Sequence, residues 1–157
     1  MYQHHREAIE KITEKLSKRK EVQGVIVGGS VAHGFATESS DIDLMIVLSD
    51  EDYERAVQSG EIGYYETEST PWPDGYVDGK YTSAAYIRKV GESGSEPAKF
   101  AFLDSFVTHS VVDGLQELVA AASRYPIERK DDNILRFHAQ CEAWKWYYHE
   151  GLKRNNR

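Results

Sequence analysis

Hydrophobic positions recur along the chain at spacings that favour particular secondary structures. Spacings of four, three and four residues predict an amphipathic first helix, whose apolar face would hold His5, Ile9, Ile12 and Leu16. The apolar run Val22–Val27 predicts a buried strand that ends at two glycines. A second strand is predicted at Asp41–Leu48, which is apolar on both faces after its first residues, as a central strand should be.

The middle of the chain predicts shorter elements. Ser49 is followed three residues later by Asp52, a pair with the form of a capping box, which predicts a short helix through Val57. The segment Glu68–Gly75 contains two prolines and is expected to be a loop. A third strand is predicted at Tyr76–Thr82.

The pattern then changes toward helices. Ser95, Glu96 and Pro97 predict the start of a helix that carries Phe100 and Leu103. The short run Phe106–His109 predicts an edge strand. A turn at Asp113-Gly114 is expected to lead into a further helix.

From about Glu128 onward one long amphipathic helix is predicted, with Ile134, Phe137, Cys141, Trp144, Tyr148 and Leu152 on one face. We expect Trp144 and Tyr148 to lie in the core. Trp146 and Tyr147 point elsewhere and would meet another domain, a second subunit or an acceptor. The order of elements, strands mixed with helices and then helices only, predicts an α+β fold with a helical C-terminal extension.

Composition narrows the class of protein. The 157 residues suit one compact domain, or one domain and part of a second. The longest apolar run, Leu44 to Leu48, is too short to span a bilayer, so no membrane partner is expected. Cys141 is the only cysteine, which excludes an internal disulfide and predicts a cytoplasmic location. The net charge of −7 disfavours a nucleic-acid polymer as partner.

Two aspartates at the start of the second strand predict a metal site. Asp41 and Asp43 are two residues apart, so their side chains share one face of the strand, with Cα atoms about 6.5 Å apart. Carboxylates so placed can converge on two Mg²⁺ ions about 3.5–4 Å apart, the separation used in phosphoryl and nucleotidyl transfer. Ile42 between them is expected to face the core and hold the pair rigid.

The glycine turn before this strand predicts a phosphate site. Gly28, Gly29 and Ser30 lie between the first strand and a short helix. Glycines allow backbone amides to approach a phosphate closely, a helix start supplies free N–H donors, and Ser30 adds a hydroxyl donor. One loop could therefore hold a triphosphate while the next strand holds its metal ions.

A third carboxylate is expected on a neighbouring strand. Alternation along Tyr76–Thr82 places Asp78, Lys80 and Thr82 on one face. Asp78 could bind the catalytic metal and accept a proton from an attacking hydroxyl, and Lys80 could neutralise phosphate charge. The alternatives are a turn residue at Asp78, because Asp-Gly is a common turn signal, and a solvated strand lysine at Lys80.

The whole run from Gly28 to Leu44 resembles the nucleotidyltransferase superfamily typified by DNA polymerase beta. It is most similar to minimal and antibiotic nucleotidyltransferases of bacteria, which share a glycine-serine turn, a short helix and a Ser-Asp-hydrophobic-Asp-hydrophobic strand. The resemblance assigns Gly29 and Ser30 to the triphosphate, and Asp41, Asp43 and Asp78 to metal ions. It also implies a mixed sheet flanked by helices. His33 departs from the pattern, because minimal members often carry arginine there.

The resemblance implies a Mg²⁺-dependent enzyme that moves a nucleoside monophosphate, AMP from ATP, to a hydroxyl of a small molecule such as an antibiotic. Residues 1–112 would form the nucleotidyltransferase domain and residues 113–157 the helical extension, which would be easier to bury with more chain or in a homodimer. Two alternatives are a protein-modifying member of a toxin–antitoxin pair and a non-catalytic nucleotide-binding module. The three aspartates argue against the last.

Overall fold

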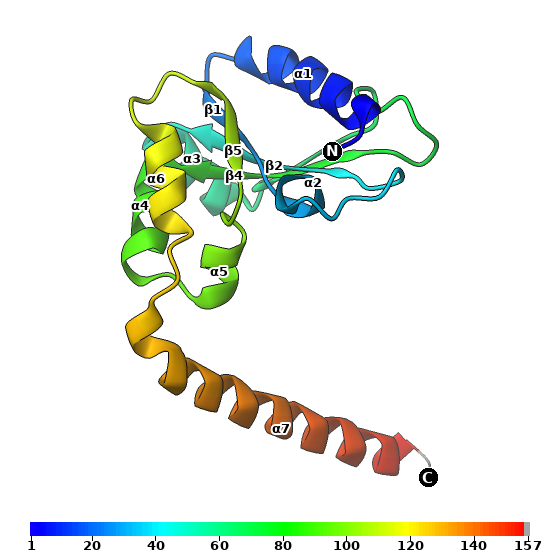
Figure 1. The fold of residues 1–157 in the computed structure, drawn as a ribbon, viewed down its shortest axis with the longest axis vertical. Coiled ribbons are helices and arrows are strands. Elements are labelled where there is room, and N and C mark those ends of the chain that lie inside the picture. The colour runs from blue at the N-terminus through cyan, green and yellow to red at the C-terminus, as the bar shows by residue number, and fades with distance from the viewer. Residues whose placement is uncertain (156–157) are drawn as a thin grey trace. The chain divides into compact units, whose positions relative to one another are not determined.

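The computed structural model describes residues 1–155 (Figure 1). The chain divides into two compact units, Met1–Arg124 and Tyr125–Arg157, which are described separately below.

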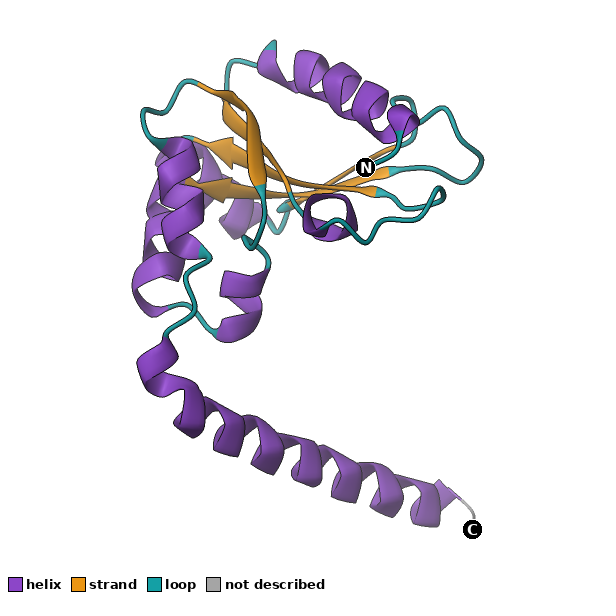
Figure 2. Ribbon diagram, viewed as in Figure 1, coloured by secondary structure: helices purple, strands orange, loops and turns teal. Residues whose placement is uncertain are grey.

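The first unit is built on a five-stranded sheet with the order β3-β4-β2-β1-β5 (Figure 2). Its strands are β1 Val22–Val27, β2 Ile42–Leu48, β3 Gly63–Glu66, β4 Val77–Ser83 and β5 Phe106–Ser110. Strands β2 and β4 pair in parallel, and the other neighbours pair antiparallel. The predicted mixed sheet flanked by helices is therefore confirmed, with β5 at an edge as expected.

Helices precede, connect and follow these strands. They are α1 Gln3–Ser17, α2 Gly29–His33, α3 Asp50–Ser59, α4 Ala84–Ser93, α5 Glu96–Phe100, α6 Leu115–Ala122 and α7 Lys130–Asn155. The predicted helices are present, although Leu103 lies beyond the end of α5. The start of α3 is confirmed in detail: the Ser49 hydroxyl accepts from the Asp52 amide at 3.1 Å and donates to the Asp52 carboxylate at 2.7 Å.

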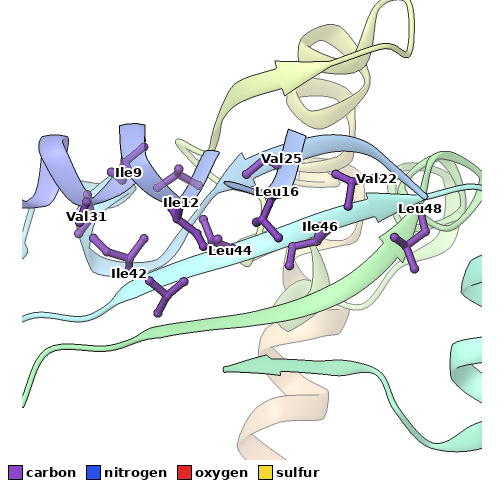
Figure 3. Packing of buried hydrophobic residues seen from close by; sticks show 13 residues of the cluster. Ile9, Ile12, Leu16, Val22, Val25, Val31, Ile42, Leu44, Ile46 and Leu48 are labelled. Atoms are coloured by element: carbon purple, nitrogen blue, oxygen red, sulfur yellow. The ribbon is translucent and has the colours of Figure 1, made fainter. Parts of the chain in front are cut away.

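Helix α1 covers one face of the sheet (Figure 3). Its Ile12 and Leu16 are fully buried against alternate residues of the two central strands, which include Val25, Val27, Ile42, Leu44 and Ile46. Burial of one such side chain stabilises the fold by about 1.5–3 kcal/mol. This layer therefore anchors the strands from which the turn and the aspartates project.

Helices α4 and α6 pack on the opposite face. Ile87 of α4 and Val119 of α6 are fully buried with Ile26 and Val47 of the sheet. Because α6 shares this core, the first compact unit extends to Arg124, past the domain boundary expected after residue 112.

The second unit contains a short 3-10 helix, Ile127–Arg129, and α7. The long helix is confirmed, but the expected burial of Trp144 and Tyr148 is wrong, because their exposed fractions are 67% and 66%. Large apolar residues occur around the whole circumference of α7, and the described part of this unit offers no second long helix to cover them. None of the helices described here combines the length and apolarity needed to cross a membrane.

Candidate active site

The parallel pairing of β2 and β4 brings two of the predicted aspartates side by side. Asp43 of β2 lies in register with Asp78 of β4, and adjacent strands lie about 4.8 Å apart. Asp41 comes directly before β2, and Ile42, between Asp41 and Asp43, is fully buried toward α1. Alternation therefore directs Asp43 and Asp78 to the face opposite α1.

Tyr76 extends this pairing by one residue, beside Asp41. The Ile42 amide donates to the Tyr76 carbonyl at 3.1 Å, which continues the ladder before β4 begins. A hydrogen bond to Asp41, together with the charges of Asp41, Asp78 and Asp43, raises the pKa of the Tyr76 hydroxyl. The hydroxyl therefore remains a donor that can hold the Asp41 carboxylate in place.

The surroundings of Asp43 disfavour the charged form of its carboxyl group. Burial is the main cause that raises the pKa of its carboxyl, followed by the neighbouring charges of Asp41 and Asp78. His33 and Lys80 act in the opposite direction. Three carboxylates that repel one another form a site that a cation would stabilise.

The glycine turn lies directly against Asp43. The Gly28 amide donates to the Asp43 carbonyl at 3.0 Å. Gly29 has φ +60°, and a Cβ atom at this position would overlap the Asp43 carboxylate. Only glycine therefore combines this backbone conformation with this close approach. The Ser30 hydroxyl is buried and has no hydrogen-bond partner among the described residues, so its capacity to donate is unused.

A cavity of about 280 Å³ opens between the turn and the aspartates. Among its lining residues are five that the sequence singled out: Gly28, Gly29, Asp43, Asp78 and Lys80. Ser30 and Asp41 do not line it directly. The structure thus gathers turn, carboxylates and lysine around one hollow of the size of a small ligand group.

His33 also lines this cavity and was not predicted to act there. Its ring is stacked between Phe35 and Phe100, at centroid distances of 5.3 and 4.8 Å. Its Nδ1 lies 3.6 Å from a carboxylate oxygen of Asp104. The side chain is only 7% exposed. His33 falls inside the motif, but Phe100 and Asp104 come from a distant segment with no local signal.

The donor set at this site fits Mg²⁺. Within residues 1–155 no group of three or more His, Cys, Asp and Glu side chains is already arranged as a metal cluster. Mg²⁺ is commonly held by one or two carboxylates, and it takes its other ligands from water and substrate phosphates. Asp43 and Asp78 in register, with Asp41 close by, supply such carboxylates, and the Ser30 hydroxyl, one residue after Gly29, has no partner among the described residues.

Comparison with known proteins identifies the family. Residues 9–108 match the family model described as nucleotidyltransferase domain. A solved structure described as a toxin-antitoxin with AMP-PNP is 14% identical, with a TM-score of 0.40 over 88% of this chain and 99% of that chain. No curated protein matches the sequence. The matched segment contains the turn and all three aspartates and covers most of the chain, so this protein belongs to the nucleotidyltransferase domain family.

Proposed function

We propose that the protein is a Mg²⁺-dependent nucleotidyltransferase that moves a nucleoside monophosphate, AMP from ATP, to a hydroxyl of a small-molecule acceptor. The observation that carries this proposal is the register of Asp43 with Asp78 beside the Gly29 turn. Carboxylates and phosphate donors are the two parts that nucleotidyl transfer needs from a protein.

The turn and Lys80 would bind the triphosphate. The backbone at Gly29 can approach phosphate oxygens closely, and the unpartnered Ser30 hydroxyl can donate to one of them. Lys80 lies two residues after Asp78 on the same face and would neutralise phosphate charge. These contacts would hold the pyrophosphate group as it leaves.

The three aspartates would hold the metal and direct the proton. Asp41, Asp43 and Asp78 would bind Mg²⁺, which when bound would neutralise phosphate charge and polarise the reacting phosphoryl group. Asp78 would accept the proton of the acceptor hydroxyl. As this hydroxyl oxygen forms a bond to the α-phosphorus, the bond from that phosphorus to the pyrophosphate oxygen breaks.

Binding and turnover test this proposal separately. Mg-ATP should raise the melting temperature of the wild-type protein, and Asp43→Asn should abolish the rise, whereas Asp113→Asn, in the exposed turn before α6, should leave it intact. An equal rise in the melting temperature of Asp43→Asn would show that Asp43 is not part of the metal site.

Turnover is measured as pyrophosphate release across a panel of nucleotides and hydroxyl-bearing acceptors. Release that depends on a small molecule supports the proposal. Release that needs an added protein would establish the protein-modifying alternative, and binding without any release would establish the non-catalytic one.

Two expectations from the sequence also carry over as proposals. A cytoplasmic location is supported by Cys141 being the only cysteine. Self-association through α7 is supported by the exposure of Trp144 and Tyr148. Light scattering of the wild-type protein and of Trp144→Ala would test the second.

A further inference from the structure

A second pocket lies on the β3 side of the sheet. It has a volume of about 530 Å³ and is lined by Tyr65 of β3 and, among others, Thr70, Trp72, Asp74 and Tyr76 of the segment before β4. It shares no lining residue with the cavity that contains Asp43 and Asp78. The proposed chemistry leaves this pocket without a role.

The strand register places Tyr65, one wall of this pocket, beside the third aspartate, whereas Trp72, another wall, packs with the apolar cluster on the α1 side. Tyr65 pairs with Asp78 across β3 and β4, and its neighbour Tyr64 packs on the α1 side, so Tyr65 faces the same side as Asp78. The Tyr65 and Tyr76 rings form a pair with centroids 5.4 Å apart and planes inclined by 31°. Tyr65 is nonetheless 66% exposed, which leaves much of its surface free for contact with another molecule.

The direction of the reaction assigns this side to the acceptor. Nucleotidyl transfer is an in-line displacement, so the attacking oxygen approaches opposite the leaving pyrophosphate. The Gly29 turn follows β1, on one side of the paired β2 and β4, and Tyr65 lies on β3, on the other side. A triphosphate held at the turn would therefore leave the β3 side to the attacking hydroxyl.

We propose that the Tyr65–Tyr76 pair is the acceptor site of this enzyme and binds a hydroxyl-bearing ring compound that carries no negative charge. The proposal rests on the nucleotidyltransferase function proposed above. It adds the location of the acceptor and its chemical class.

The chemistry of the pocket defines that class. Tyrosine rings offer apolar faces with hydroxyl groups at their edges, a combination that suits a ring compound such as a sugar. Asp74 lines the pocket, and Tyr76 brings Asp41 to its border through their hydrogen bond. No lysine or arginine occurs among the described lining residues. An anionic ring would thus meet like charge, whereas a neutral or cationic ring would not.

Three probes of one ring shape and different charge test the site: glucosamine, glucose and glucose 6-phosphate. Ligand-observed saturation-transfer NMR is recorded on the full chain with Mg²⁺ and an ATP analogue whose α–β bridge cannot be cleaved. Glucosamine and glucose should bind, and glucose 6-phosphate should bind at least roughly threefold more weakly. Tyr65→Ala should weaken glucosamine binding by roughly three- to tenfold.

The matched control is Tyr86→Ala, which removes an exposed tyrosine from another ring pair of the same unit, with Tyr53 at 5.8 Å. It should leave probe binding unchanged. The proposal would be overturned if none of the probes binds, or if glucose 6-phosphate binds more tightly than the other two. It would also be overturned if Tyr65→Ala and Tyr86→Ala weaken glucosamine binding equally. So would a loss of Mg-ATP affinity in Tyr65→Ala, because the rings would then serve the nucleotide. The readout is independent of turnover, so the two failures can be told apart. An inactive protein would refute the proposed function and with it the acceptor role, whereas Tyr65-dependent binding would still establish a ring-binding site.

Discussion

On the α1 side of the sheet Ile42, Leu44 and Ile46 of β2 are at most 3% exposed, whereas on the opposite side Asp43 of the same strand lines a cavity. The packed face stabilises the fold through apolar burial. The opposite face is open only at the end that carries Asp43 and the cavity, called the open face below. This end opposes folding, since burial and two neighbouring carboxylates disfavour the charge on Asp43. Strand β2 thus holds Asp43 beside two like charges because its other face is firmly packed.

The largest expected effect separates chemistry from binding on the open face. If Asp78 acts mainly in the transition state, Asp78→Asn should keep its Mg-ATP affinity within a few-fold. Its turnover should fall by roughly three orders of magnitude or more. Pyrophosphate release and calorimetric titration measure the two quantities. Near-normal turnover in Asp78→Asn would show that another acidic residue, such as Asp74 or Asp104, is the third carboxylate.

A substitution on the packed face should lower the stability of the fold and leave nucleotide binding unchanged. Ile46→Ala should lower the free energy of unfolding by about 2–5 kcal/mol, because the residue is fully buried under α1. The folded fraction should still bind Mg-ATP with near wild-type affinity. Urea denaturation and titration check both. Ile46→Val, with an expected cost of about 0.5–1.5 kcal/mol, serves if the alanine variant does not fold. A large loss of affinity in Ile46→Val would show that the faces are not independent.

The glycine turn, which lies against Asp43, should depend on its backbone more than on the Ser30 hydroxyl. Ser30→Ala removes one donor to a charged group and should weaken Mg-ATP binding by roughly tenfold. Gly29→Val should weaken it further, because the added side chain would overlap Asp43 and disfavour φ +60°. Calorimetric titration that gave the reverse order would contradict the phosphate-binding role of the turn.

The smallest expected effect is a gain in stability on the open face. The folded-state pKa of Asp43 is raised above its ordinary 3.8, so wild-type stability is lost as the pH rises through that pKa. Without metal, Asp43→Asn should therefore melt about 1–4 °C higher than wild type at pH 7, and the gain should vanish near pH 3.5. Melting curves with a chelator, and Asp113→Asn as control, measure it. A lower melting temperature at pH 7 would show that the ionised carboxylate stabilises the fold.

The motif residues were predictable because turn, short helix and strand are contiguous in sequence. Strand alternation alone placed Ile42 in the core and Asp43 on the other face. The register of Asp43 with Asp78 was not accessible in this way, because it depends on which distant strands pair. The roles of these residues stay predictions.

For other parts of the fold, the local sequence did not indicate the structure. Strand β3 is four residues long and partly exposed, and α4 follows β4 at Ser83 without an intervening glycine or proline. The surroundings of His33 come from the segment that holds Phe100 and Asp104. For α7 the spacing of apolar residues predicted a helix, but spacing cannot show whether a partner covers Trp144.

The parallel pairing of β2 with β4 also affects when the site can form during synthesis. Parallel neighbours need a crossover connection, and here α3 and β3 lie between the two strands in sequence. The Gly29 turn and Asp43 leave the ribosome early, but Asp78 can join them only after the crossover and β4 have emerged. A nascent chain released before Asp78 would carry most of the motif and still lack the neighbour that completes its carboxylate pair.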